Sequence, residues 1–348
     1  MKRLSIVVLL LLAGCDLSSG PEATDPITED ALLEHLNYLA DDSLYGRGSG
    51  TEYELEAAEY IRDEFDSYGL VPGVAGWFQS FSYQSGPALA PAGEPVDNNA
   101  EFGSGWDGLR GASGFAPETV QEQETPSQNV LGVIPGQGAL SEQWVILGAH
   151  YDHIGFTRVT DDSIIIFNGA DDNASGTTVL LEVARYLAHY FNEGVARSLD
   201  RRSLMFQAYG AEEVGLRGSR YFVENSTMPL DSITAMVNLD MVGRLRGGEL
   251  YALGGSSSPL WEPLLRERNE DNLQFVIPVN TTGRSDHAPF YEREIPVLFF
   301  YTGTHEQYHD PDDDVWLLNT TGMVTVADLT IAVLADLLVR PEPPTFVP

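Results

Sequence analysis

Cysteine, basic side chains and long apolar segments are all scarce in this chain of 348 residues. Cys15 is its single cysteine, so an intrachain disulfide is excluded. The 52 acidic residues outnumber the 19 lysines and arginines, and the formal net charge of −33 argues against nucleic acid as a partner. After the amino terminus, no run reaches the roughly 18 uninterrupted apolar residues of a transmembrane helix. A hydrophobic content of 43% is nevertheless typical of a globular protein.

The first residues are organised like an export signal. A basic start precedes an apolar run over residues 4–12 that is too short to span a bilayer. The string LLAGC then resembles the bacterial lipobox, whose cysteine becomes the lipidated first residue of the mature protein. We therefore expect a signal peptide over 1–14, a lipid on Cys15 and a tether over 15–28. This arrangement would place the protein in a bacterial cell envelope, facing the periplasm or the exterior. It would contact the membrane only through the lipid. The alternative is an ordinary signal peptide with an incidental cysteine.

Beyond the tether, the spacing of apolar residues predicts an α/β domain over 29–340. Spacings of three and four indicate helices from residue 29 and over about 51–68. Residues 72–127 are rich in Gly, Pro, Ser and Asn, so we expect an irregular insert there, with one short strand and a position at the mouth of the active site. Further along, strands are predicted at 129–134, 144–149, 203–209, 233–239, 250–253, 274–277 and 296–300, and helices at 176–190, 215–224 and 323–338. This alternation predicts a mostly parallel mixed sheet with helices on both faces.

Possible metal ligands occur in five loops that follow the predicted strands. They are His150 in HYDH, Asp171-Asp172-Asn173, Glu212-Glu213, Asp240, and His309 with the acidic run 310–314. Ligands of such sheets bind at the carboxyl ends of the strands, so we expect these loops to meet.

Each loop also has an ordinary explanation when it is taken alone. The residues at 171–173 could cap a helix, the paired glutamates could occupy a helix first turn, and Asp240 could be a turn residue. The run 310–314 could be a solvated loop or a weak calcium site. Two imidazoles and three carboxylates without cysteine, gathered at one sheet edge, instead predict a hydrolytic zinc site in which one carboxylate bridges two ions.

Six strings in this chain resemble the di-zinc aminopeptidases of peptidase clan MH, which are related to glutamate carboxypeptidases and glutaminyl cyclases. The strings are HYDHIG (150–155), GADDNASG (169–176), GAEEVGLRGS (210–219), NLDMVG (238–243), GRSDHAPF (283–290) and YHDPDD (308–313). The stretch LADDSLYGRGSG (39–50) also looks like the family's N-terminal helix and loop. The resemblance implies the zinc-dependent exopeptidase fold, which is phosphorylase/hydrolase-like.

The same resemblance implies a set of metal ligands. His150 and Asp240 would hold one zinc ion, Glu213 and His309 would hold the other, and Asp172 would bridge the two. Asp172 is preferred to its neighbour because it directly precedes Asn-Ala-Ser-Gly, as the family's bridging aspartate does.

Roles for residues around the ligands follow in the same way. Glu212 matches the general base, and Asp152 and Asp313 fall where the family keeps carboxylates that orient ligand histidines. Tyr308 and Arg284 fall where some members bind the substrate carbonyl. His153 and His287 match no ligand position, so we expect them to support the ligands or the packing.

The implied activity is the release of N-terminal amino acids from small peptides by a two-zinc aminopeptidase. Three alternatives stay open: a carboxypeptidase or dipeptidase of the same fold, a glutaminyl cyclase with one working zinc, and a receptor-like ectodomain without catalysis. The oligomeric state is also left open by the sequence.

Overall fold

The computed structural model describes residues 26–85, 123–160, 163–192, 197–278 and 285–348. The predicted signal peptide, Cys15, nearly all of the predicted tether, most of the 72–127 insert and Arg284 therefore lie outside the described residues.

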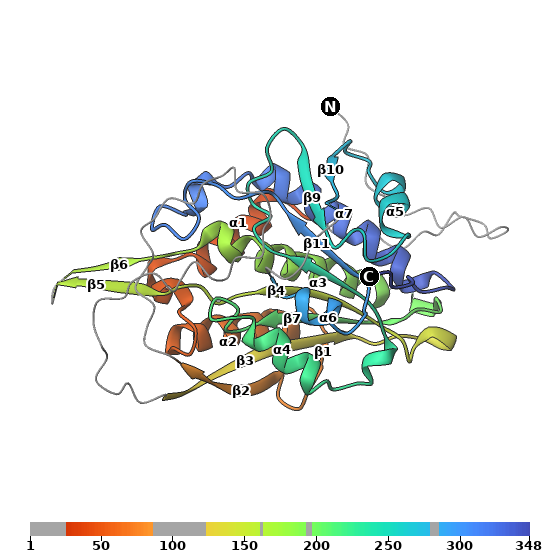
Figure 1. The fold of residues 1–348 in the computed structure, drawn as a ribbon, viewed down its shortest axis with the longest axis horizontal. Coiled ribbons are helices and arrows are strands. Elements are labelled where there is room, and N and C mark those ends of the chain that lie inside the picture. Colours follow the sequence, from red (N-terminus) through yellow and green to blue (C-terminus); the bar gives the residue numbers. More distant parts are fainter. Residues whose placement is uncertain (1–25, 86–122, 161–162, 193–196, 279–284) are drawn as a thin grey trace.

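A nine-stranded mixed sheet lies at the centre of the described structure (Figure 1). The strands follow the order β1-β3-β7-β4-β8-β11-β9-β10, and β2 pairs with β3. Their bounds are β1 (Val71–Pro72), β2 (Phe78–Ser85), β3 (Gln123–Ile134), β4 (Trp144–His150), β7 (Ser203–Tyr209), β8 (Ile233–Leu239), β9 (Glu249–Leu253), β10 (Gln274–Val276) and β11 (Val297–Tyr301).

The four central strands of this sheet, β7, β4, β8 and β11, are parallel. In their register, Leu147 of β4 lies opposite Phe206 on one side and Val237 on the other. Towards the edges the pairings of β3 with β7 and of β9 with β11 are antiparallel. The predicted mixed sheet is thus confirmed, with its continuous parallel part at the centre, where the carboxyl ends of four strands meet at one edge.

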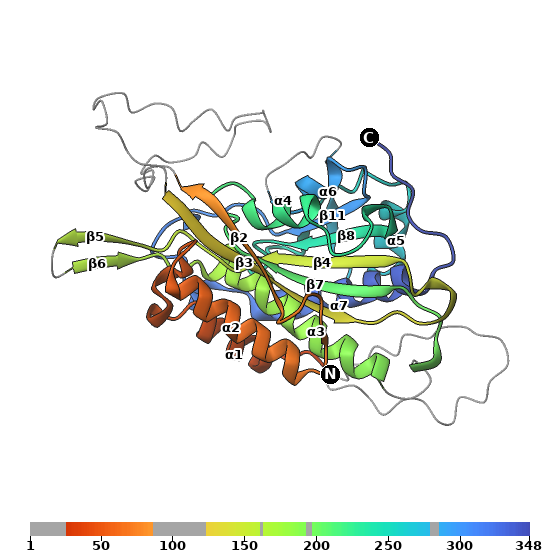
Figure 2. The same cartoon turned by 90° about the horizontal axis from the view of Figure 1, so that it is seen from below.

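Helices cover both faces of the sheet, as predicted (Figure 2). Their bounds are α1 (Glu29–Leu39), α2 (Glu52–Ser67), α3 (Gly176–Asn192), α4 (Arg217–Glu224), α5 (Trp261–Glu267), α6 (Ala288–Tyr291) and α7 (Thr320–Val339). Successive residues of a strand point to opposite faces. The buried apolar residues form a larger core cluster on one face of the sheet and a smaller one on the other. Leu147 packs in the larger cluster with residues of α1, α2, α3 and α7, and Ile146 packs in the smaller cluster with residues of α4 and α6.

Local sequence sets where several helices begin. The Thr28 hydroxyl accepts a hydrogen bond from the Ala31 N–H at 3.2 Å, and the Thr51 hydroxyl accepts one from the Glu54 N–H at 3.3 Å. These side chains satisfy N–H groups that have no partner within the first helical turn. The Asn319 side chain does the same for α7, and this helix therefore starts three residues before the predicted boundary.

Helix α7 is the most apolar segment of the closing region, with a mean hydropathy of 1.9 over 18 residues. It is long and apolar enough to cross a membrane, but 61% of that stretch is buried inside the protein. Met323, Leu334 and Leu338 belong to the larger core cluster, and the helix contacts α1 and α3. Its apolar character is therefore that of a core helix, and no other helix among the described residues passes the same test.

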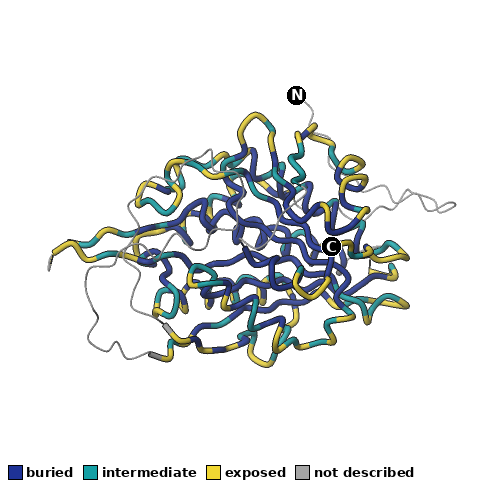
Figure 3. Tube along the Cα trace, viewed as in Figure 1, coloured by how far each residue is buried: buried dark blue, intermediate teal, exposed yellow. Residues whose placement is uncertain are grey.

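Several short elements of the structure were not predicted, namely β1, α5, α6 and a hairpin. β5 (Phe156–Thr160) and β6 (Ser163–Ile166) form an antiparallel hairpin that projects from the body, and most of it is exposed (Figures 1 and 3). Because this hairpin buries little on either face, its sequence carries no clear alternation of buried and exposed side chains, which is the usual signature of a strand.

Candidate metal centre

The five predicted ligands converge beside the carboxyl ends of the central strands. His150 is the last residue of β4, Glu213 and Asp240 follow β7 and β8, and His309 lies in the loop after β11. Asp172 differs from the expectation, because it does not directly follow a strand of the main sheet. It lies in the irregular helical segment η4 (Ala170–Ser175), between the β5–β6 hairpin and α3.

His150, Asp172 and Asp240 form the first group of possible ligands. The Nε2 atom of His150 lies 3.3 Å from Asp172 Oδ1 and 3.4 Å from Asp240 Oδ1. All three residues are buried, and their ligand atoms lie within 4.8 Å of one another. Imidazole nitrogens and carboxylate oxygens are both ligands of zinc.

A second group surrounds the other oxygen of Asp172. Asp172 Oδ2 lies 3.1 Å from His309 Nε2, which in turn lies 3.2 Å from Glu213 Oε2. Asp172 therefore directs one carboxylate oxygen to each group, which is the arrangement that a bridging ligand requires.

His153 belongs to this second group, although it was expected only near the ligands. Its Nδ1 atom lies 2.7 Å from Glu213 Oε1 and 4.0 Å from Asp172 Oδ2. Gly169 makes room for the imidazole: its φ is +55°, and an added Cβ atom would lie 2.4 Å from His153 Cδ2. The close contact and the left-handed backbone together favour glycine at this position.

The electrostatics of the cluster favour the binding of a cation. Burial alone would lower the pKa of His309, but the facing carboxylates of Glu213 and Asp172 raise it to about 11. Burial would likewise raise the pKa of Asp172, yet contacts with His150 and His309 hold it well below its usual range. In addition, Asp240 Oδ1 and His309 Nε2 are buried and have ligand atoms within 3.4 Å, yet no described partner meets them with the geometry of a hydrogen bond. These residues fit divalent metal ions of the zinc type, whose binding displaces protons from such histidines.

Glu212 and Glu213 are presented by a tight turn after β7. The Asp152 carboxylate holds this turn, because Oδ1 accepts a hydrogen bond from the Glu212 N–H at 3.0 Å and Oδ2 accepts one from the Glu213 N–H at 3.3 Å. His150 Nδ1 lies 3.2 Å from the Asp152 main-chain oxygen and 3.7 Å from its Oδ1, so Asp152 orients this ligand through its main chain, with its carboxylate nearby. Asp152 thus positions residues of both ligand groups.

The side chain of Glu212 occupies a strongly acidic environment. Burial, together with the carboxylates of Asp286, Glu213 and Asp240, raises its pKa well above the ordinary value, although His150 opposes the shift. A carboxyl group with a raised pKa can both take and return a proton near neutral pH.

Asp313 has a different role from the predicted one. Its Oδ2 accepts hydrogen bonds from the N–H groups of Asp171 at 2.8 Å and Asp172 at 3.1 Å, and its Oδ1 lies 3.1 Å from Arg244 Nη2. Among the described contacts, none joins Asp313 to His150 or His309. The irregular η4 segment leaves these buried N–H groups without main-chain acceptors, and Asp313 supplies one.

Tyr308 and His287 differ in their access to the site. The Tyr308 ring stacks on the His309 ring with centroids 3.9 Å apart and is 38% exposed, so it can reach a substrate. His287 is 1% exposed, and its ring packs 4.8 Å from that of Phe299. Burial lowers the pKa of His287 to about 3, so it serves as a neutral packing residue.

The segment before α2 braces the site, and no role was predicted for its individual residues. The buried Arg47 guanidinium donates to the main-chain oxygens of Tyr151 at 2.8 Å and Gly169 at 3.0 Å, which fixes the two chain segments that carry His153 and Asp172. The Ser49 hydroxyl donates to Asp152 Oδ2 at 2.6 Å. The string GRGSG within 39–50 was the only signal of this bracing in the sequence.

Comparisons with known proteins agree with this geometry. Residues 129–334 match the model of Peptidase family M28. The chain is 30% identical over 229 residues to Aminopeptidase YwaD of Bacillus subtilis, and the match covers 63% of this chain and 46% of that relative. The chain spans about half the length of the curated relatives that it matches.

Solved structures show the same fold. BSAP, a zinc aminopeptidase from Bacillus subtilis, superposes with a TM-score of 0.65 at 20% identity, covering 93% of this chain and 98% of that one. A glutaminyl cyclase from Porphyromonas gingivalis superposes with a TM-score of 0.60 at 17% identity, covering 90% and 99%.

Proposed function

This chain belongs to Peptidase family M28, and we propose that it is a metal-dependent aminopeptidase that uses two zinc ions to release N-terminal amino acids from small peptides. The observation that carries the proposal is the position of Asp172, with one oxygen facing His150 and the other facing His309. The names of the similar proteins support the same activity.

The residues that would hold the ions are those of the two groups. His150 and Asp240 would hold one ion, Glu213 and His309 the other, and Asp172 both. Zinc bound there would lower the pKa of a water molecule and polarise the scissile carbonyl group.

Glu212 would perform the proton transfers. It accepts a proton from the attacking water as the water oxygen bonds to the carbonyl carbon, and it returns that proton to the leaving nitrogen as the C–N bond breaks. The Tyr308 hydroxyl would donate a hydrogen bond to the oxyanion that forms meanwhile. The carboxylates of Glu212 and Asp240 also suit the positive amino terminus of a substrate.

Matched pairs of peptides with free and acetylated amino termini test this proposal on the zinc-loaded protein. We expect cleavage of the first residue from the free peptides alone. Release of the last residue from acetylated peptides would indicate a carboxypeptidase, and formation of pyroglutamate from a glutamine-initiated peptide would indicate a cyclase. Absence of turnover together with absence of bound zinc would point to a receptor-like domain.

The role of Glu212 is tested by Glu212→Gln, which keeps the size of the side chain but cannot accept the proton. We expect kcat to fall by about 10²–10⁴-fold while both zinc ions stay bound. Glu213→Gln should instead lose metal. Glu262→Gln, at an exposed position on α5, provides a control with the same chemical change. If Glu212→Gln loses zinc and Glu213→Gln keeps it, the two roles are exchanged.

We also propose that the chain is held at a membrane by a lipid on Cys15, on the strength of the LLAGC string. Cys15→Ala should release the protein from the membrane fraction or block its processing. Wild-type protein that fractionates as soluble, with no lipid detected by mass spectrometry, would contradict this proposal.

A further inference from the structure

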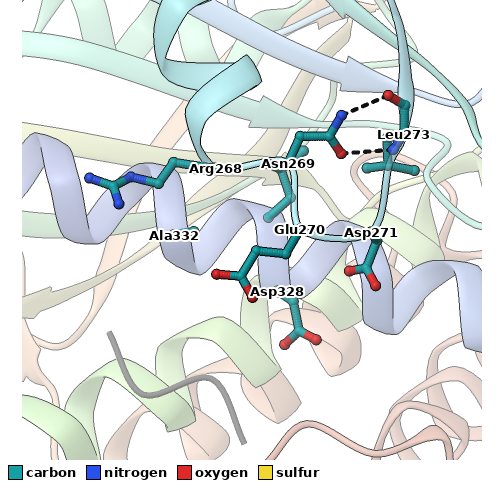
Figure 4. A pocket seen from close by; sticks show the side chains of 8 residues that line it. Arg268, Asn269, Glu270, Asp271, Leu273, Asp328 and Ala332 are labelled. Atoms are coloured by element: carbon teal, nitrogen blue, oxygen red, sulfur yellow. Dashed lines mark hydrogen bonds between the residues drawn. The ribbon is translucent and has the colours of Figure 1, made fainter. Parts of the chain in front are cut away.

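A cavity of about 320 Å³ lies between the loop after β8 and the loop that leads to His309. Arg244 and Arg246 from the first loop line it together with His305 and Glu306 from the second. The pocket between α7 and the loop after α5 is far smaller, about 20 Å³, and its lining holds three acidic residues and one arginine (Figure 4). Only the larger cavity can hold part of a small organic ligand, and it contains none of the candidate metal ligands.

Three buried nitrogen atoms in this lining form no hydrogen bond with described residues. They are Arg244 Nε and both ring nitrogens of His305, and the side chains are 10% and 4% exposed. His305 Nε2 lies 3.1 Å from Asp171 Oδ2, so His305 Nδ1 is the ring nitrogen without a nearby carboxylate. An unpaired buried donor is costly, because it has lost its hydrogen bonds to water. An acceptor within the cavity would remove this cost.

Arg246 adds an uncompensated charge to the same cavity. Its guanidinium donates to main-chain oxygens, those of Arg244 at 3.1 Å and of Gly303 and Thr304 at 3.3 Å, and no described carboxylate forms an ion pair with it. This is unusual in a chain with 52 acidic and 19 basic residues. Glu306 is exposed and opposes the binding of an anion, and Arg244 is already paired with Asp313 at 3.1 Å, so the attraction rests mainly on the Arg246 guanidinium.

We propose that this cavity binds the carboxylate at the free C-terminus of a short peptide substrate. The proposal rests on the proposed peptidase function, and it narrows the substrates to small peptides with an unmodified end. Guanidinium groups donate charge-assisted hydrogen bonds to a carboxylate, and such bonds are about twice as strong as neutral ones.

The position of the cavity along the chain limits the length of the substrate peptide. His305 precedes the ligand His309 by four residues, and Arg244 follows the ligand Asp240 by four, so each wall lies within about 14 Å of a candidate ligand along the chain. A peptide extends by about 3.4 Å per residue. A carboxylate up to about four residues beyond the scissile bond can therefore reach the cavity, which corresponds to peptides of at most about five residues.

The test compares Leu-Gly-Gly with Leu-Gly-Gly-amide as substrates of the zinc-loaded full chain. We expect kcat/KM to favour the free acid by about tenfold or more, as for a charge-assisted hydrogen bond. In Arg246→Gln this ratio should fall towards one, and in Arg246→Lys it should be intermediate, because the charge stays but the main-chain contacts that fix the guanidinium are lost. Arg266→Gln, on the exposed side of α5, removes an equal charge elsewhere and should keep the wild-type ratio.

A binding measurement separates this proposal from the proposed activity. Gly-Gly should raise the melting temperature of the metal-free wild-type chain, whereas Gly-Gly-amide should not, and Arg246→Gln should lose the effect. Equal turnover of acid and amide by the wild type would overturn the cavity proposal while leaving the peptidase function intact. If neither peptide is turned over, the proposed peptidase function is contradicted. The shift in melting temperature would then still show whether the cavity binds the carboxylate. If acetate raises the melting temperature as much as Gly-Gly does, and turnover shows no preference for the free acid over the amide, the cavity binds free carboxylates. That result would overturn its role in substrate binding.

Discussion

The Glu54 carboxylate on α2 accepts a hydrogen bond from the Ala211 N–H at 3.0 Å, which ties this helix to the turn that presents Glu212. The same carboxylate accepts from the Ser127 hydroxyl at 2.8 Å and from the Gly50 N–H at 2.7 Å. Glu54 is 1% exposed, so water cannot replace these contacts. It thereby connects three segments that are distant in sequence.

Glu54 should make stability depend on pH. Burial, reinforced by the nearby Asp152, raises the pKa of Glu54 to about 8, although its hydrogen-bond donors oppose the shift. The folded state then holds a proton that the unfolded state releases near pH 4.5, so the free energy of unfolding falls as pH rises from about 4.5 to about 8. In Glu54→Gln this decline should be smaller, and the variant should be less stable at low pH because its amide opposes the Gly50 N–H. Thermal unfolding across this pH range measures both effects, and parallel curves for the two proteins would contradict the assignment.

Replacing Asp172 should remove metal from both ligand groups. Asp172→Asn keeps the shape of the side chain but withdraws the charge that faces His150 and His309. We expect most of both zinc ions to be lost, as measured by elemental analysis of the purified protein. Asp231→Asn, at an exposed position, is the control and should keep the wild-type metal content. Full retention of zinc by Asp172→Asn would show that this carboxylate does not bridge.

His153 should affect one ion more than the other. Its Nδ1 lies 2.7 Å from Glu213 Oε1, so His153→Gln should weaken the metal held by Glu213 and His309 by about 10–100-fold, as is usual for a residue that orients a ligand. The ion held by His150 and Asp240 should be less affected. Zinc titration by calorimetry resolves the two events, and His189→Gln, at an exposed position on α3, serves as the control. If the affinities for both zinc ions are unchanged, His153 acts only as a packing residue.

The contact between α2 and the sheet should account for much of the stability. Phe206 of β7 is fully buried, and its ring centroid lies 6.1 Å from that of Phe65 on α2. Phe206→Ala should cost about 3–5 kcal/mol of the free energy of unfolding, because it removes apolar contacts and leaves a cavity. Trp316→Ala, where the side chain is 76% exposed, should change it by about 0.5 kcal/mol or less. Chemical denaturation measures both variants, and a similar cost for the two would contradict this account of the core.

Much of the fold could be predicted from the sequence, because it depends on short-range patterns. The central strands are buried on both faces and appear as short apolar runs, and the long helices carry apolar residues at spacings of three and four. Thr28 and Thr51 mark two helix starts by hydrogen bonds within one turn. The hairpin at 156–166 was missed because it lacks such a pattern. Neither of its faces is buried, so its sequence does not alternate between apolar and polar residues.

The sequence by itself also determined which side chains gather at the metal centre. His150 ends one strand of a parallel set, Glu213 and Asp240 follow two others, and the carboxyl ends of such strands share one edge. Only the tertiary structure decided how they are held. Asp313 supports the main chain of Asp172 rather than a histidine, and Glu54 reaches Ala211 across 157 positions of the chain. These contacts depend on which buried N–H groups lack an acceptor once the chain has folded, and no local pattern in the sequence records that.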